Sequence, residues 1–82
     1  MASPSFTIYS RPDCHLCDEM QSVVAPVAAQ LGATLEMIDI NDSPELEQRF
    51  GLEVPVLFVN GRKAAKYRVT ARELQRHLRN TA

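Results

Sequence analysis

Residues 6–17 read Phe6-Thr7-Ile8-Tyr9, then Ser10-Arg11-Pro12-Asp13, then Cys14-His15-Leu16-Cys17, and this stretch decides the fold. Its first four residues favour a strand and its next four favour a turn. From position 16 to position 31 the apolar residues recur at the spacing of one helix face. Both cysteines of the chain therefore lie where a strand and a turn are followed by the start of a helix.

The position of Cys14 predicts a reactive thiol. The first turn of a helix has backbone N–H groups without intrahelical partners, and the helix dipole places partial positive charge there. Both effects stabilise a thiolate, so we expect the pKa of Cys14 to lie below the ordinary value for a cysteine. Cys17 follows about one helical turn later, close enough to form a disulfide with Cys14. The pair therefore predicts a redox-active dithiol.

Neighbouring charges act on this thiol in opposite directions. Arg11, and His15 when it is protonated, favour the thiolate, and we expect His15 to be an exposed side chain that tunes it. Three acidic side chains oppose them, namely Asp13, Asp18 and Glu19. We expect Tyr9 to pack beneath the motif without a chemical role.

The rest of the chain alternates between strand and helix patterns. Strands are predicted at residues 6–9, 34–40, 54–59 and 62–67, and helices at 15–31, at 44–50 and from 71 onward. The boundaries rest on local signals: Gly32 as a helix C-terminus, Ser43-Pro44-Glu45 as a helix start, Asn60-Gly61 as a hairpin turn, and Thr70 with Glu73 as a capping box.

The same patterns predict which side chains are buried. In the first helix the apolar face comprises Leu16, Met20, Val23, Val24, Val27 and Leu31, with Pro26 off that face and bending the helix. The second helix should bury Leu46 and Phe50. In the last, Val69 and Leu74 should form a hydrophobic staple, and the buried stripe should comprise Ala71, Leu74 and Leu78. Met37 also falls on an apolar position and is expected in the core.

The order βαβαββα predicts an α/β fold of one domain over residues 1–82. The first two strands need a crossover helix and should be parallel with a right-handed connection, whereas the hairpin makes the last two antiparallel. Helices should then cover both faces of a four-stranded mixed sheet. This is the topology of a small thioredoxin fold.

Composition excludes several other classes of protein. Two cysteines in 82 residues are too few for a secreted disulfide scaffold, and Met1-Ala2-Ser3-Pro4-Ser5 has neither part of a signal peptide. No stretch is long and apolar enough for a membrane span. We therefore expect a cytoplasmic protein with no membrane partner.

Charge is distributed unevenly along the chain. Residues 1–53 carry two basic and nine acidic side chains, a net charge of −7, whereas residues 54–82 carry seven basic and one acidic, a net charge of +6. Most of these charges are expected on solvated faces, although the basic part could steer an anionic partner. Nucleic acid is not expected as a partner, because Tyr67 is the only aromatic residue of residues 62–82.

Two segments resemble a known family. Residues 9–17 resemble the active-site segment of glutaredoxins, and Val54-Pro55-Val56-Leu57-Phe58-Val59-Asn60-Gly61 resembles their Val-Pro strand and hairpin. With His-Leu between the cysteines, the chain is most similar to short bacterial glutaredoxin-like proteins. The resemblance implies a thiol–disulfide oxidoreductase whose Val54–Pro55 peptide bond is cis and faces the cysteines.

The resemblance also implies roles for individual residues. Cys14 would be the exposed nucleophile and Cys17 the more buried resolving thiol. Arg11 stands where glutaredoxins often carry a lysine that binds a carboxylate of glutathione. Val54, next to Pro55, would offer its backbone N–H and C=O to a substrate peptide.

Two positions differ from the glutaredoxin pattern. His15-Leu16 replaces the usual Pro-Tyr between the cysteines, so the tyrosine contact to glutathione is absent at this part of the substrate site. The Gly-Gly-x-Asp turn that receives the γ-glutamyl end of glutathione corresponds to residues 65–68, which read Ala65-Lys66-Tyr67-Arg68. A basic residue therefore stands near the place of the acid.

The expected activity is disulfide reduction by a monomer with no bound cofactor or metal. The partner would be a disulfide-containing protein or glutathione, and glutathione could also be the reductant. Zinc is disfavoured because His15 lies between the cysteines and His77 lies on the last helix. One alternative is a non-enzymatic module that binds a metal, an Fe–S cluster or a partner protein at the cysteines. Another is a reductase dedicated to a single oxidised substrate.

Overall fold

The computed structural model describes residues 4–81, so the expectation of no signal peptide falls largely on residues 1–3, outside the described residues. The elements follow the expected order, with one additional 3₁₀ turn, η1. They are β1 (Ser5–Ser10), α1 (His15–Leu31), β2 (Thr34–Asp39), η1 (Ile40–Asp42), α2 (Pro44–Phe50), β3 (Val56–Val59), β4 (Arg62–Lys66) and α3 (Ala71–Thr81).

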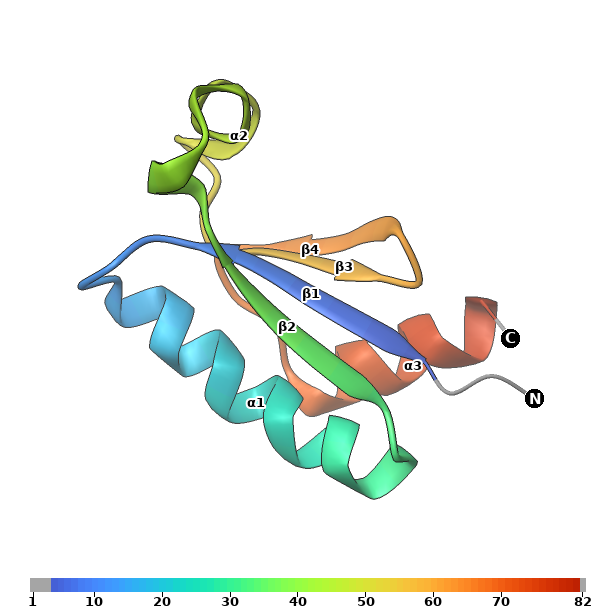
Figure 1. Ribbon diagram of the computed structural model, residues 1–82. Helices are drawn as coiled ribbons and strands as arrows, with labels where there is room; N and C mark the ends of the chain where they lie inside the picture. Colours follow the sequence, from blue (N-terminus) through green and yellow to red (C-terminus); the bar gives the residue numbers. More distant parts are fainter. Residues whose placement is uncertain (1–3, 82) are drawn as a thin grey trace.

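The four strands form one mixed sheet in the order β2-β1-β3-β4. β1 is parallel to β2 and antiparallel to β3, and β4 is antiparallel to β3, as predicted for the crossover and the hairpin. Figure 1 shows α1 and α3 on one face of the sheet and α2 on the other. The two central strands are therefore covered on both sides, which explains the unbroken apolar run of β3.

Each face of the sheet has its own core. Phe6 and Ile8 of β1 are fully buried on the α1 and α3 face, together with Met20 of α1 and Leu74 of α3. On the α2 face the buried cluster comprises Ile40, Phe50 and Val56. Because side chains alternate along a strand, β1 can supply residues to both cores.

Tyr9 belongs to the α2 face. Its ring stacks on Phe50 with centroids 4.6 Å apart and meets the edge of Phe58 at 5.3 Å. Aromatic pairs in these geometries stabilise a core beyond the area that they bury. The packing role expected for Tyr9 matches these contacts.

The local signals for the ends of elements are confirmed. Gly32 ends α1 in the left-handed region with φ 63°, and Asn60 and Gly61 form the hairpin turn with φ values of 52° and 82°. At the start of α3 the Thr70 N–H donates to Glu73 Oε1, and the Glu73 N–H donates to Thr70 Oγ1, both at 3.1 Å. These are the two reciprocal bonds of a capping box.

Three strands are shorter than predicted. β3 begins at Val56 because Pro55, the residue before it, has no N–H to donate to a neighbouring strand. β4 ends at Lys66 because Tyr67 takes a positive φ of 67°. β2 ends at Asp39, whose carboxylate accepts a hydrogen bond from the Asn41 N–H and caps η1.

Three side chains expected in the core are exposed. Met37 is 36% exposed on β2, which is an edge strand and has a neighbouring strand on one side only. Leu31 is 45% exposed at the last position of α1, and Ala71 is exposed at the first position of α3. Positions at the rim of a sheet or at a helix end have fewer neighbours than the periodicity of the sequence implies.

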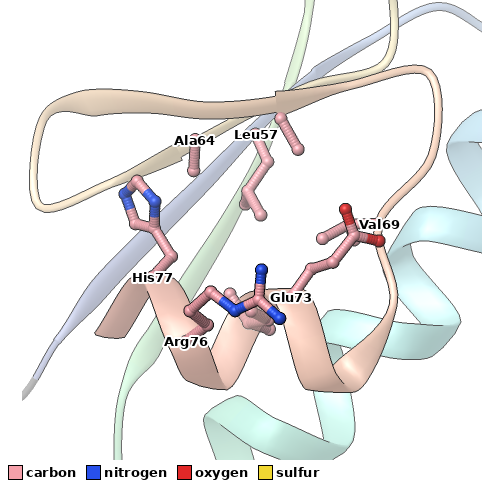
Figure 2. A pocket seen from close by; sticks show the side chains of 8 residues that line it. Leu57, Ala64, Val69, Glu73, Arg76 and His77 are labelled. Carbon is pink, nitrogen blue, oxygen red and sulfur yellow. The ribbon is translucent and has the colours of Figure 1, made fainter. Parts of the chain in front are cut away.

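A hollow of about 190 Å³ lies between α3 and the β3–β4 hairpin. Figure 2 shows His77, Arg76 and Glu73 of α3 at this hollow, with Leu57 and Ala64 of the hairpin opposite. Within residues 4–79, His77 Nε2 is the one buried side-chain nitrogen or oxygen without a hydrogen-bond partner. No cysteine lines this hollow.

Candidate functional site at the cysteine pair

The two cysteines lie at the start of α1, where the sequence placed them. After β1 the chain turns through Asp13, which has a φ of 56°, and Cys14 becomes the N-cap of α1. The Cys17 N–H donates to Cys14 Sγ at 3.1 Å, and the Asp18 N–H donates to the Cys14 C=O at 3.1 Å. A sulfur atom therefore takes the place of the usual capping oxygen and accepts a hydrogen bond from a backbone N–H of the helix.

The two sulfur atoms are joined as a disulfide, with Cα atoms 5.2 Å apart. The cysteines differ in exposure: Cys17 is only 2% exposed, whereas Cys14 is half-buried. An incoming thiol or disulfide therefore reaches Cys14 Sγ more easily than Cys17 Sγ. This difference fits the predicted order of nucleophile and resolving thiol, although the roles themselves stay predictions.

The loop before β3 lies beside the cysteine turn. Tyr9 pairs with Val56 in antiparallel register, which places Pro55 next to Ser10 at the end of β1. The peptide bond between Val54 and Pro55 is cis. Among residues 4–81 neither the N–H nor the C=O of Val54 makes a hydrogen bond. Both groups are therefore available to a partner outside the fold.

Arg11 is held by protein groups rather than directed at the cysteines. Its Nη1 donates to Glu47 Oε2 at 2.7 Å and to Asn41 Oδ1 at 3.0 Å, and its Nη2 bonds to Glu47 Oε1 and to the Gly51 C=O, the latter at 2.9 Å. The hydrogen bond to Arg11 lowers the pKa of Glu47 from its ordinary value. This arginine thus ties the cysteine turn to α2 and the loop that follows it. Its predicted contact with a substrate carboxylate stays a prediction.

His15 and Leu16 lie on the first turn of α1. The His15 side chain is 86% exposed, with Nε2 at 3.4 Å from Glu19 Oε1, and Leu16 is half-buried. An exposed imidazole beside the more accessible cysteine fits the expected tuning role. Glu19 opposes that role, because its carboxylate offers protonated His15 a competing negative partner.

A second hollow, of about 350 Å³, lies between α1 and the connection from β4 to α3. It is lined by Glu19, Met20, Tyr67 and Arg68, among others. Arg68 Nη1 lies 3.9 Å from Glu19 Oε2, and the arginine side chain is 76% exposed. The turn that the resemblance assigns to the γ-glutamyl end of glutathione thus presents a cation.

The sequence predicted neither the exposure of Leu52 nor a contact between Leu52 and Tyr67. Tyr67 Oη donates to the Leu52 C=O at 2.9 Å, and Leu52 itself is 92% exposed. One feature of the sequence could have indicated that Leu52 is exposed: it directly follows Gly51, which ends a helix, and it belongs to no periodic pattern of apolar residues. Nothing in the sequence indicated which residue would bind its carbonyl group.

Two further features concern possible ligands and membranes. No group of three or more histidine, cysteine or acidic side chains within residues 4–81 is arranged to hold a metal ion. In the same residues, no helix has both the length and the apolar character needed to cross a bilayer.

Comparisons with known proteins give the same fold. A structural genomics target, XcR50 from X. campestris, is 37% identical, with a TM-score of 0.72 over 94% of this chain and 97% of that chain. Desulfothioredoxin from Desulfovibrio vulgaris Hildenborough, solved in its reduced form, is 25% identical, with a TM-score of 0.71 over 96% of this chain and 82% of that one. The predicted thioredoxin fold is therefore confirmed.

Comparisons of sequence identify the family. An uncharacterized protein of Mycobacterium tuberculosis is 25% identical over 80 residues, which cover 92% of this chain and 82% of that protein. The model of the glutaredoxin-like domain (DUF836) matches residues 5–79, which include the cysteine pair, the cis-proline loop and all three helices up to the last residues of α3. The chain belongs to this glutaredoxin-like domain family.

Proposed function

We propose that this protein is a thiol–disulfide oxidoreductase that reduces disulfides through Cys14 and Cys17. One observation carries the proposal: Cys14 Sγ is the more accessible sulfur of a bonded pair and accepts a hydrogen bond from the Cys17 N–H at the start of α1. The same amide would stabilise a thiolate at Cys14 once the pair is reduced. Membership of a glutaredoxin-like family supports this chemistry.

The reaction consists of two thiol–disulfide exchanges. The Cys14 thiolate attacks one sulfur of the substrate disulfide, forms a mixed disulfide and releases the other sulfur as a thiolate. Cys17 then loses its proton to solvent and attacks Cys14 Sγ, which releases the second substrate thiolate and forms the Cys14–Cys17 disulfide. Two electrons pass to the substrate, and an external thiol or dithiol returns the pair to its reduced form.

The surrounding residues would bind the substrate and tune the thiolate. The free N–H and C=O of Val54 would pair with the backbone of an extended substrate segment, with Pro55 next to the reacting sulfurs. His15 and Leu16 would contact the substrate from the helix side. Arg11 would act mainly by fixing the cysteine turn to Glu47, with any contact to substrate secondary.

The proposal also covers the reductant, the cellular compartment, the oligomeric state and the substrate. The protein would need no bound cofactor, and glutathione or a dithiol reductase would supply the electrons. A monomer in the cytoplasm fits a chain with one cysteine pair, because thiols stay reduced in that compartment. The substrate would be a disulfide-containing protein or glutathione, without nucleic acid or membrane.

The experiment that tests the proposal traps the intermediate. Reduced Cys17→Ser protein is incubated with a model disulfide and analysed by mass spectrometry, with Cys14→Ser as the matched control. We expect one mixed disulfide at Cys14 in the first variant and much slower adduct formation in the second, because Cys17 is buried. Absence of an adduct, together with a metal or cluster bound to the purified wild-type protein, would instead support the non-enzymatic module.

A further inference from the structure

Tyr67 holds both ends of the loop that contains the cis peptide bond. Its Oη donates to the Leu52 C=O at 2.9 Å, and its backbone N–H donates to the Pro55 C=O at 2.8 Å. The tyrosine adopts a positive φ of 67°, and β4 ends at the residue before it, Lys66. One residue directly after β4 thus holds the carbonyl groups of both Leu52 and Pro55.

The charged side chain of the loop also turns toward β4. Glu53 Oε1 bonds to Lys63 Nζ and lies 3.8 Å from Lys66 Nζ. The hydrogen bond to Lys63 lowers the pKa of Glu53, so this carboxylate stays ionised at neutral pH. The Glu53 N–H donates to the Phe50 C=O at 2.8 Å, which also ties the loop to the end of α2. These bonds hold the backbone on both sides of Leu52 and the side chain of Glu53.

The side chain of Leu52 is 92% exposed. Tyr67 beside it is 42% exposed. A single exposed leucine needs no explanation by itself. Here its carbonyl group is pinned, and it lies two residues before Val54, whose backbone groups are free. An apolar side chain held rigidly beside open backbone groups is preorganised for binding, because little entropy is lost when a partner covers it.

We propose that Leu52, Val54 and Tyr67 form a docking edge for an extended segment of a disulfide-bearing protein. In this edge, Leu52 is the apolar anchor, Val54 pairs with the backbone, and Tyr67 is a positioning residue. The segment that fits it carries an apolar side chain within a few residues of its cysteine. Glutathione has no apolar side chain and gains nothing from Leu52, so the edge favours protein substrates. The inference rests on the proposed function.

The test of the anchor compares substrates on one variant. The substrates are peptide disulfides in which a single leucine stands one to four positions from the cysteine, a leucine-free parent peptide, and oxidised glutathione. Leu52→Ser should raise KM for the best leucine peptide about tenfold, which corresponds to about 1.4 kcal/mol. KM for the parent peptide and for oxidised glutathione should not change. Leu31→Ser is the matched control, because Leu31 is an exposed leucine at the end of α1.

The test of the positioning residue removes one hydroxyl group. Tyr67→Phe should raise KM for the leucine peptide about fivefold with kcat unchanged, as expected for loss of one hydrogen bond. The backbone amide hydrogen of Glu53 should also exchange with solvent faster, because the hydrogen bond that fixes the loop at Leu52 is lost. Tyr9→Phe is the matched control, since the Tyr9 hydroxyl makes no hydrogen bond within residues 4–81, and it should change neither quantity.

The outcomes separate the two proposals. If the wild-type protein reduces disulfides but Leu52→Ser affects every substrate equally or none, the docking edge is refuted and the oxidoreductase stands. Preference of the wild-type protein for oxidised glutathione over all the peptides would also refute the edge. If the wild-type protein reduces no disulfide at all, the oxidoreductase proposal fails and the docking edge fails with it.

Discussion

At the scale of single residues, the environment of Cys14 Sγ determines the chemistry available to the protein. The sulfur accepts the Cys17 N–H at 3.1 Å and occupies the N-cap of a helix 17 residues long. Hydrogen bonding to the charged form and the helix dipole both lower a thiol pKa, and the dipole alone contributes about 0.3–2 kcal/mol. Nearby carboxylates oppose this lowering of the pKa, but they leave the hydrogen bond from the Cys17 N–H in place.

This geometry predicts the reactivity of reduced Cys14. In the Cys17→Ser variant, alkylation of Cys14 by iodoacetamide should follow a titration whose midpoint lies below that of a free cysteine thiol. The measurement is the rate of alkylation from pH 5 to pH 10, with a small free thiol as the reference compound. A midpoint equal to or above that of the reference would show that the helix start does not activate the thiol.

At the scale of elements, the Arg11–Glu47 pair joins the cysteine turn to α2. The hydrogen bond to Arg11 lowers the pKa of Glu47 in the folded protein below its ordinary value of 4.5. A lowered folded-state pKa contributes stability above the unfolded-state pKa, and this stability is lost as pH falls through the folded-state value. The side chains are partly exposed, so solvent weakens the contribution.

The pair therefore predicts a pH-dependent effect of Glu47→Gln. The variant should unfold at a lower urea concentration than the wild-type protein at pH 7, and the difference should shrink as pH falls below about 4.5. Glu45→Gln is the control, because Glu45 is an exposed acid of α2 with no ion pair in residues 4–81. An equal difference at pH 7 and at pH 3 would mean that ionisation of Glu47 is not the cause.

Signals within a few residues of one another predicted the helices and strands, whereas contacts between distant residues could not be predicted. The capping box of Thr70 and Glu73 spans three residues and follows from local chemistry. The bond from Arg11 to Glu47 spans 36 residues, and that from Tyr67 to Leu52 spans 15. A local sequence pattern does not show which side chain will meet another that is distant in the sequence but close in the fold. The cysteine pair was identifiable because both members lie within one helical turn.

At the scale of the whole molecule, two leucines in neighbouring segments differ completely in burial. Leu57 of β3 is fully buried on the face of the sheet that α1 and α3 cover. Leu52, in the loop before the strand, is 92% exposed. A domain of this size has a free energy of unfolding of only about 4–12 kcal/mol. A buried leucine on a central strand therefore carries a large share of the stability, and an exposed one carries almost none.

Substitution of these two leucines should separate stability from binding. Leu57→Ala should lower the free energy of unfolding by about 2–5 kcal/mol through lost burial and a cavity. Leu52→Ser should change it by less than about 0.5 kcal/mol. Urea denaturation of both variants measures these effects. If Leu52→Ser destabilised the protein as much as Leu57→Ala, the loop leucine would be part of the core. Its exposure would then give no reason to treat it as a docking anchor, because any loss of substrate binding could follow from loss of the fold.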